Sequence, residues 1–372
     1  MFLYPRSAQA VLMSFMITVT GTGNALVILG FVINKKLRTP SNYFLLNLAI
    51  SDFFTGVFTL PLYLNNYIIN GKWVHGKDVC KLWLTIDYTL CQSTIYNIVL
   101  ISSDRFLAVT KAVKYRDQQN KMKPAFLKMA AVWILAFLNF GPAIIIWEYA
   151  VGYSLLSEGD CNPEFFYSGH YLLYSSIFDF FTPMTAIAFF NLSIYFNIRS
   201  RTKYKVQRNL AGFQEPTMSS VFVVDCTNVI SRNMPSVPHE TTPSVSRNSK
   251  ILQSLSRICK TNHHSPDVRD ETKNSALAKD KKMAKSLSVL VCTFSLCWAP
   301  YCFLTIVREG FCTTCISPVL YDVTCWLFFL NSSINPFIYP LCHPAFKKTL
   351  MQMICFNRNN HEMISKDTKT IK

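Results

Sequence analysis

The sequence predicts an all-α membrane protein: a bundle of seven transmembrane helices followed by a short amphipathic helix. Half of the 372 residues are hydrophobic and only 16% are charged. The hydrophobic residues gather in seven long runs, and a membrane-spanning helix needs about 20 mainly apolar residues. Soluble helices of that length would carry a polar face, which these runs lack. The runs cover residues 9–33, 43–68, 79–104, 124–147, 168–197, 284–307 and 316–341.

The positions of lysine and arginine predict which loops face the cytoplasm, because basic residues are enriched on the inner side. The loop between the first two spans contains NKKLRTPS, and the loop between spans three and four contains KAVKYRDQQNKMKP. The loop between spans four and five contains no lysine or arginine. We therefore expect an extracellular N-terminus and a cytoplasmic C-terminus. The net charge of +16 reflects this bias and does not indicate nucleic-acid binding.

We expect the chain to divide into four parts. Residues 1–201 hold spans one to five, 202–278 form a disordered third intracellular loop rich in Ser, Asn, Pro and Lys, 279–342 hold spans six and seven, and 343–372 form a membrane-surface helix and a cytoplasmic tail. The stretch HPAFKKTLMQMICF after span seven is basic and amphipathic, which is typical of a helix on the inner membrane surface. Cys355 within it is either palmitoylated or a free thiol.

Four cysteines fall on the expected outer side, where oxidation is permitted. We expect Cys80, at the top of span three, to pair with Cys161 and to hold the following loop over the bundle. Cys312 and Cys315 form a CxxC motif in the short loop between spans six and seven. Such a motif also occurs in redox and zinc sites. Because no second pair accompanies it, we expect a small loop disulfide.

The third span carries charged residues at both ends. Asp87 lies seven residues after Cys80, about 10 Å below the outer surface, and Arg105 lies about 27 Å further along the same stripe. A charge at membrane depth is unfavourable unless it has a partner or faces water. No basic residue in another span is available to Asp87, so we expect it to bind a cationic ligand; the alternative is satisfaction by neighbouring hydroxyl groups. Asp104 beside Arg105 indicates a switchable ion pair rather than simple membrane anchoring.

A second polar group and a helix kink are predicted nearer the middle of the bundle. One carboxylate among hard oxygen donors suits a hydrated Na⁺ ion, and a water-filled hydrogen-bond network is the alternative. The members of this group are Asn24, Asp52, Thr94, Asn331, Ser332 and Asn335. In span six, Pro300 removes a backbone hydrogen bond and kinks the helix. Trp298, two residues earlier, makes this kink a candidate two-state element.

Asp179, in the stretch SIFDFFTP of span five, is a further carboxylate at membrane depth. No lysine or arginine lies near it in sequence. Either this segment does not span the membrane, or Asp179 binds a positive or proton-donating group. The apolar composition of the run favours the second interpretation.

In combination, these motifs resemble those of the rhodopsin-like (class A) G-protein-coupled receptors over nearly all of the chain outside the long loop. They are Asn24, NLAISD with Asp52, Asp104-Arg105-Phe106, Trp133, CWAP with Trp298 and Pro300, and Asn335-Pro336-Phe337-Ile338-Tyr339. The resemblance implies a plasma-membrane receptor, not an enzyme, that engages a heterotrimeric G-protein, arrestin and receptor kinases. It assigns activation roles to Asp104, Arg105, Asp280, Trp298, Pro300, Asn335, Pro336 and Tyr339. Phe106 departs from the usual Tyr of the family, and Asn191 stands where most members carry a span-five Tyr.

The resemblance also implies a ligand. An aspartate at the place of Asp87 is typical of aminergic receptors, where it binds a protonated amine. An acid one turn before Pro183 resembles the histamine receptors of types 3 and 4, and the sequence looks most like type 4. Histamine and an inhibitory-type (Gi/o) G-protein are therefore expected, with the ammonium at Asp87 and the imidazole at Asp179. The expected ligand-binding residues are Asp87, Tyr88, Cys91, Phe165, Phe166, Asp179, Trp298, Tyr301, Cys302 and Phe329.

Two departures from the type-4 pattern keep other ligands open. Asp179 replaces Glu and reaches about 1.3 Å less, and Phe328 and Phe329 replace a Gln and a Trp. The alternatives are another cationic amine, such as a trace amine or acetylcholine, or an orphan receptor. Acetylcholine has no N–H to donate to Asp179. A retinal protein would need a lysine in span seven, which is absent, and a transporter would usually show inverted repeats. No cofactor is expected apart from an allosteric Na⁺ ion.

Overall fold

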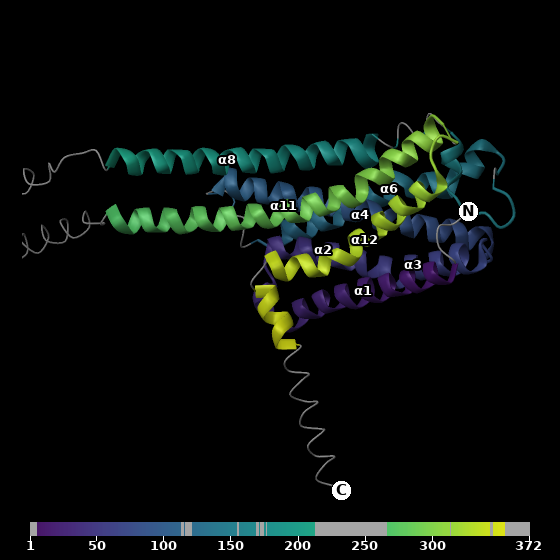
Figure 1. The fold of residues 1–372 in the computed structure, drawn as a ribbon, viewed down its shortest axis with the longest axis horizontal. Helices are drawn as coiled ribbons and strands as arrows, with labels where there is room; N and C mark the ends of the chain where they lie inside the picture. Colours follow the sequence, from purple (N-terminus) through teal and green to yellow (C-terminus); the bar gives the residue numbers. More distant parts are fainter. Residues whose placement is uncertain are drawn as a thin grey trace, which may run out of the picture. The chain divides into compact units, whose positions relative to one another are not determined.

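The computed structural model describes residues 6–112, 115, 121–154, 156–168, 171, 175, 177–212, 266–312, 314–342 and 345–353. Its α-helices are α1 (Arg6–Ile33), α2 (Pro40–Phe54), α3 (Leu60–Tyr63), α4 (Gly76–Thr110), α6 (Lys123–Val151), α8 (Thr182–Gly212), α11 (Pro266–Gly310) and α12 (Pro318–Cys342) (Figure 1). The shorter segments are the 3-10 turns η1 (Lys35–Leu37) and η4 (Glu164–Tyr167), and the π-helical η2 (Thr55–Thr59), η3 (Leu64–Asn70) and η5 (Ile177–Phe181). Strands are absent from these residues.

Each of the seven predicted runs contains helix in the structure. Five helical segments are long and apolar enough to cross a membrane: Arg6–Ile33, Pro40–Asn70, Lys123–Val151, Ile177–Tyr204 and Ala284–Arg308. Length and composition alone do not identify α4 and α12 as membrane-spanning helices. The reason is their polar interior positions, among them Asp87 and Asp104 in α4, and Asn331 and Asn335 in α12.

The chain divides into two compact units, one formed by residues 1–195 and 282–372 and the other by residues 196–281. The expected disordered loop, 202–278, is helical at both ends, because α8 continues to Gly212 and α11 begins at Pro266. These ends continue helices that have already formed, and a helix extends through polar helix-forming residues more easily than it begins. Residues 213–265 lie outside the described part of the chain.

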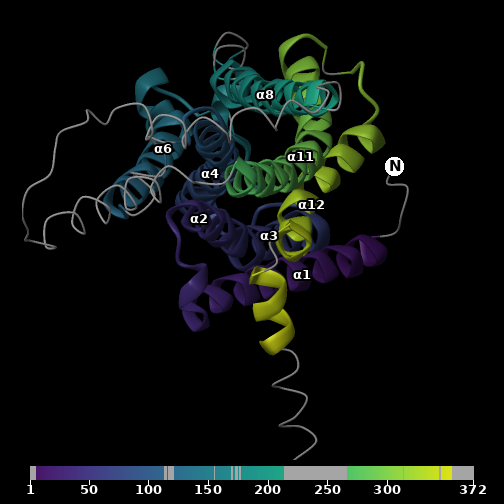
Figure 2. The same ribbon diagram turned by 90° about the vertical axis from the view of Figure 1, so that its left-hand side faces the viewer.

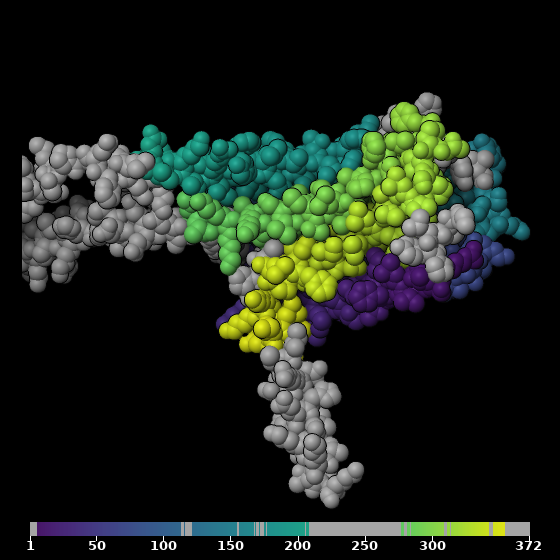
Figure 3. Space-filling model, in the orientation of Figure 1, coloured from purple at the N-terminus to yellow at the C-terminus, as the bar shows by residue number. Residues whose placement is uncertain are grey.

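In the first unit, α1 packs against α2 and α12, and α4 packs against α2 and α6. Figure 2 looks along these helices and shows them grouped as a bundle. In the space-filling view, the side chains of α12 (yellow) lie along those of α1 (purple) (Figure 3). Residues 345–353 form a further helical stretch, where Phe346 packs on Phe31 and Asn34 Nδ2 donates to Thr349 Oγ1 at 2.7 Å. The membrane-surface position of this stretch stays a prediction, and Cys355 lies outside the described residues.

A buried polar contact joins three helices near the middle of the bundle. Asn47 Nδ2 in α2 donates to Asn97 Oδ1 in α4 at 2.7 Å, and Trp133 Nε1 in α6 donates to Asn47 Oδ1 at 2.9 Å. Asn47 and Asn97 are buried. Hydrogen bonds in such a low-dielectric setting are strong, and leaving one partner unpaired is unfavourable. This contact therefore fixes the relative register of α2, α4 and α6.

A second set of contacts closes the end of the bundle at which α4 begins. Disulfides join Cys80 to Cys161 and Cys312 to Cys315, and the first of these confirms the predicted pairing. Tyr67 donates its hydroxyl to the carbonyl of Cys161. Lys77 and Lys81 at the start of α4 bind the two carboxylate oxygens of Glu148 in α6, at 2.5 and 2.7 Å. The loop after α6 is therefore held over this end of the bundle.

The close approach of α1 to η2 depends on Gly56. A Cβ atom at Gly56 would lie 2.8 Å from the backbone nitrogen of Gly21, closer than real side chains come to backbone. We expect Gly56→Ala to force the helices apart and to lower the stability of the detergent-solubilised protein by about 1–3 kcal/mol. Gly30→Ala is the matched control, because its Cβ would meet its nearest atom at an ordinary 3.7 Å. Equal thermal unfolding temperatures for the two variants would contradict this interpretation.

Candidate ligand-binding site

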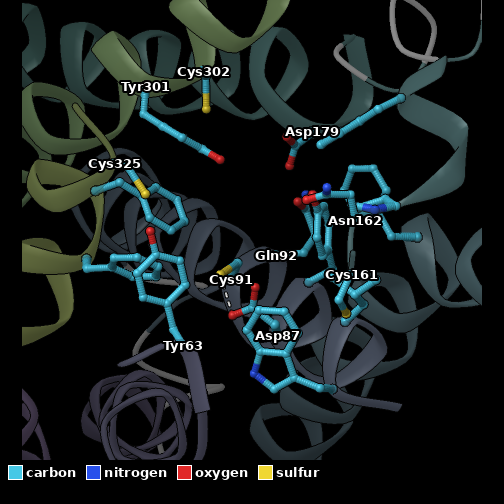
Figure 4. Close-up of a pocket in the computed structure, with 18 of the residues that line it drawn as sticks. Tyr63, Asp87, Cys91, Gln92, Cys161, Asn162, Asp179, Tyr301, Cys302 and Cys325 are labelled. Carbon is cyan, nitrogen blue, oxygen red and sulfur yellow. Dashed lines mark hydrogen bonds between the residues drawn. The ribbon is translucent and has the colours of Figure 1, made fainter. Parts of the chain in front are cut away.

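A cavity of about 260 Å³ lies inside the first unit (Figure 4). Nine of the ten predicted ligand residues line it: Asp87, Tyr88, Cys91, Phe166, Asp179, Trp298, Tyr301, Cys302 and Phe329. The other lining residues are Tyr63, Tyr67, Trp83, Leu84, Gln92, Phe140, Cys161, Asn162, Pro163, Tyr321, Cys325 and Phe328. Polar groups within a mainly aromatic wall are typical of small-molecule sites.

One face of α4 supplies the floor of the cavity. Trp83, Leu84, Asp87, Tyr88, Cys91 and Gln92 all line it. Their spacing repeats every three to four residues, as expected for one side of a helix. The same periodicity was available in the sequence and could have identified Gln92. The thiol of Cys91 donates to Asp87 Oδ1 at an S···O distance of 3.8 Å. This is a weak donor, and no basic residue among those described forms an ion pair with Asp87.

Asp179 faces the cavity from a different helix, across from Asp87 (Figure 4). It belongs to η5, the π-helical turn that leads directly into α8. Pro183 follows four residues later and has no N–H to bond the carbonyl of Asp179. The proline therefore explains why regular α-helical hydrogen bonding is interrupted at this turn, a feature frequent at functional sites. No side-chain hydrogen bond reaches the Asp179 carboxylate within the described part of the chain.

Aromatic side chains from α11 and α12 form the opposite wall. Phe328 packs on Trp298 and Tyr301 with ring centroids 4.6 and 4.9 Å away. The hydroxyl of Tyr321 donates to that of Tyr301 at 3.4 Å. Phe329 packs on Tyr63 at 5.3 Å. Phe328 was not among the predicted ligand residues, although it contacts two of them. The wall it completes is apolar and suited to a cation or an aromatic ring.

Phe165 does not line the cavity, contrary to the prediction. It is fully buried in the core cluster behind the cavity, where it stacks on Phe140 at 5.6 Å. Its neighbour Phe166 does line the cavity. Both belong to η4, and successive residues of a 3-10 turn point in directions about 120° apart. The two side chains therefore point in different directions, and only Phe166 faces the cavity.

The predicted polar group around Asp52 forms in part. Asn335 Nδ2 donates to Asp52 Oδ2 at 2.8 Å, and Asn24 Nδ2 donates to the carbonyl of Ser332 at 3.1 Å. Three buried oxygens, Oδ1 of Asp52, Oδ1 of Asn24 and Oδ1 of Asn331, have no hydrogen-bond partner among the described residues. Unpaired acceptor oxygens without a donor fit a small hard cation. Thr94 instead donates its hydroxyl to the carbonyl of Leu90 in its own helix.

Among the predicted activation residues, Asp104 lies toward the end of α4 that is remote from the cavity. Asp104 Oδ2 accepts hydrogen bonds from Ser41 and from Tyr115, each at 2.9 Å. Burial, followed by the charge of Asp104, raises the pKa of Tyr115 to about 12, so this hydroxyl remains a donor at neutral pH. Asn191 Nδ2 donates to Ser102 Oγ at 3.2 Å, linking α8 to α4. The side chain of Asp280 lies outside the described residues.

Trp298, Pro336 and Tyr339 are buried, whereas Pro300 is partly exposed. Trp298 lies beneath Pro300 within α11 and packs on Phe294 with ring centroids 5.4 Å away. Pro336 lies close to Gly23 of α1, where an added Cβ would come within 2.9 Å of the proline ring. Tyr339 is 1% exposed, and its hydroxyl has no hydrogen-bond partner among the described residues.

Comparison with known proteins agrees with this geometry. The family model described as "7 transmembrane receptor (rhodopsin family)" matches residues 23–339. The chain is 35% identical to the histamine H4 receptor of Homo sapiens, over 96% of this chain and 94% of that protein, and 36% identical to the histamine H4 receptor of Mus musculus, over 96% and 95%. It is 27% identical to the muscarinic acetylcholine receptor M1 of Homo sapiens, over 90% of this chain and 86% of that protein.

These matches confirm the predicted seven-helix membrane fold, which composition alone marked in five of the helices. They also confirm that the protein is a receptor rather than an enzyme. The chain belongs to the rhodopsin family of seven-transmembrane G-protein-coupled receptors, in its aminergic group.

Proposed function

We propose that this receptor binds histamine in the cavity between Asp87 and Asp179 and signals through an inhibitory-type (Gi/o) G-protein at the plasma membrane. One observation carries the proposal: two carboxylates that form no ion pair within the described residues face the same cavity from different helices. The histamine H4 receptors among the relatives support it. We place the outer surface at the end that bears the Cys80–Cys161 disulfide, since disulfides form outside the cytosol. The N-terminus is then extracellular and the C-terminus cytoplasmic.

The chemistry of the cavity matches the two ends of histamine. The ammonium group binds the Asp87 carboxylate in a charge-assisted hydrogen bond, the strong kind in a partly dry site. Tyr88, Tyr301 and Trp298 supply ring faces that attract a cation. At the far end, an imidazole N–H donates to Asp179. Asp87 then gains a cationic partner, and Asp179 gains a hydrogen-bond donor.

Acetylcholine is the second candidate, because muscarinic receptors are also among the relatives. A quaternary ammonium can bind Asp87 and the aromatic wall through cation–π attraction. It has no N–H, however, and its ester has only acceptors, so Asp179 would stay unpaired in the cavity. An unpaired buried carboxylate is unfavourable. Cells expressing the full chain, challenged with histamine, acetylcholine and trace amines and read by cyclic AMP, separate these candidates.

Binding would act on the bundle through α11. A ligand that joins α4 to the segment of η5 changes the packing beside Trp298, directly beneath the Pro300 kink. Movement of the inner end of α11 would then expose Arg105 and its surroundings to a G-protein, and afterwards to receptor kinases and arrestin. Asp104, Asn335, Pro336 and Tyr339 are assigned to the same transition, because all lie buried between the cavity and the inner end.

Sodium would bind beside Asp52. The unpaired oxygens of Asp52, Asn24 and Asn331 would coordinate the ion, and Asn335 would hold the carboxylate in place. Within the described residues no cluster of three or more His, Cys, Asp or Glu side chains suits a transition metal. A single carboxylate with neutral oxygens gives weak, reversible binding of a monovalent ion, which is suited to modulation.

The role of Asp87 can be tested by Asp87→Asn. This change removes the negative charge and keeps the size, so the affinity for every amine should fall at least about 100-fold. Asp78→Asn is the control, because Asp78 lies exposed in the first turn of the same helix. Binding of labelled histamine to membranes measures both. Unchanged histamine affinity in Asp87→Asn would refute the ligand model.

The role of Asp179 can be tested by Asp179→Asn. Histamine potency should fall by about tenfold or more, since a charge-assisted bond becomes a neutral one. The potency of phenethylamine, which has no ring N–H, should change by less than about threefold. Equal losses for the two amines would show that Asp179 acts on the structure of the site and not on the imidazole.

The sodium site can be tested by Asp52→Asn. In the wild-type receptor, replacing N-methylglucamine chloride by NaCl should lower agonist affinity, because the ion favours the resting packing. The variant should lose most of this dependence, while Asp78→Asn should keep it. Sodium dependence that persisted in Asp52→Asn would exclude this site.

A further inference from the structure

Gln92 is a polar residue of the cavity wall. It lies in α4, lines the cavity and is only 1% exposed. Tyr96, one turn further along the helix, is near enough for its hydroxyl to interact with the Gln92 amide. Within the described residues, however, neither Nε2 nor Oε1 has a partner at hydrogen-bond distance and angle. Buried amides are almost always paired in native proteins, so the partner of Gln92 is expected to enter through the cavity.

Gln92 and Asp179 lie at the same end of the cavity. Asp179 is near enough to Cys91 and Tyr96 to act on both electrostatically, and these residues flank Gln92 along α4. Asp87 lies five residues earlier, about 7.5 Å along the helix axis. Figure 4 shows Asp87, Gln92 and Asp179 around one cavity. An amine held at Asp87 therefore directs its other end toward both Gln92 and Asp179.

The two side chains complement each other chemically. A carboxylate only accepts hydrogen bonds, whereas an amide both donates and accepts. A neutral imidazole carries one N–H and one bare nitrogen. Its N–H can donate to Asp179 while Nε2 of Gln92 donates to the bare nitrogen. A protonated imidazole donates twice, to Asp179 and to Oε1 of Gln92.

We propose that Gln92 and Asp179 form a two-point subsite that selects amines whose distal ring carries two hydrogen-bonding nitrogens. Gln92 forms a hydrogen bond with the second ring nitrogen, the one that Asp179 does not bond. This assignment rests on the proposed amine-receptor function and names the ligand class within it. It makes Gln92 a specificity-determining residue, since ligands with one ring nitrogen or none leave its amide unpaired.

The test combines Gln92→Leu with three ligands: histamine, its pyrrole analogue that keeps only the ring N–H, and phenethylamine, which has neither nitrogen. Potency is measured by cyclic AMP in cells that express the full chain at matched surface levels. Gln92→Leu should lower histamine potency about five- to tenfold and should leave the pyrrole analogue and phenethylamine within about twofold. Asp179→Asn should lower the potencies of histamine and of the pyrrole analogue by similar factors.

Ser93→Ala is the matched control, because Ser93 is buried beside Gln92 but bonds only the carbonyl of Leu90. It should leave all three potencies unchanged. An equal loss for all three amines in Gln92→Leu would show a packing role and overturn the subsite. No loss for histamine would overturn it as well, with the amine-receptor function intact. If the wild-type receptor responded to none of the three amines, the proposed function would fail and the subsite with it.

Discussion

A carboxylate inside a membrane bundle must be paired, hydrated or kept for a ligand, and much of this receptor is organised around three of them. Asp52 is fully buried and held on one oxygen by Asn335. Asp87 has a weak thiol donor, Cys91, and Asp179 has no side-chain hydrogen bond in the described part of the chain. The side-chain hydrogen bonds to these carboxylates therefore become weaker, and then absent among the described residues, from the middle of the bundle to the cavity. The least satisfied carboxylates are those placed where a cation can reach them.

Contacts between helices hold the carboxylates and the cavity walls in place. The contact among Asn47, Asn97 and Trp133 fixes three helices at mid-depth. The disulfide Cys80–Cys161 and the double ion pair of Glu148 fix the end at which α4 begins. By contrast, α11 contains Pro300 and meets α12 through the packing of aromatic rings and through contacts of the Tyr321 hydroxyl with Tyr301 and Thr305.

The far end of the cavity differs in detail from the pattern of type-4 histamine receptors. Asp179 has a shorter reach than the glutamate of that pattern, and the wall next to Tyr301 is closed by Phe328 in place of an amide. Gln92 supplies an amide from α4 instead. Polar side chains of the cavity wall therefore come from both α4 and η5.

The sequence by itself determined the membrane class, the seven runs, the Cys80–Cys161 pair and three of the α4 residues that line the cavity, Asp87, Tyr88 and Cys91. These follow from composition, helical period and the chemistry of isolated charges, which are local properties. Only the tertiary structure decided that Phe166 and not Phe165 faces the cavity, that Thr94 bonds its own helix, and that Phe328 completes the aromatic wall. It also decided that the Gln92 amide, near Asp179, has no partner at hydrogen-bond distance and angle within the described residues. Contacts between helices depend on their rotation and depth relative to one another, and those are set by packing of side chains far apart in the chain.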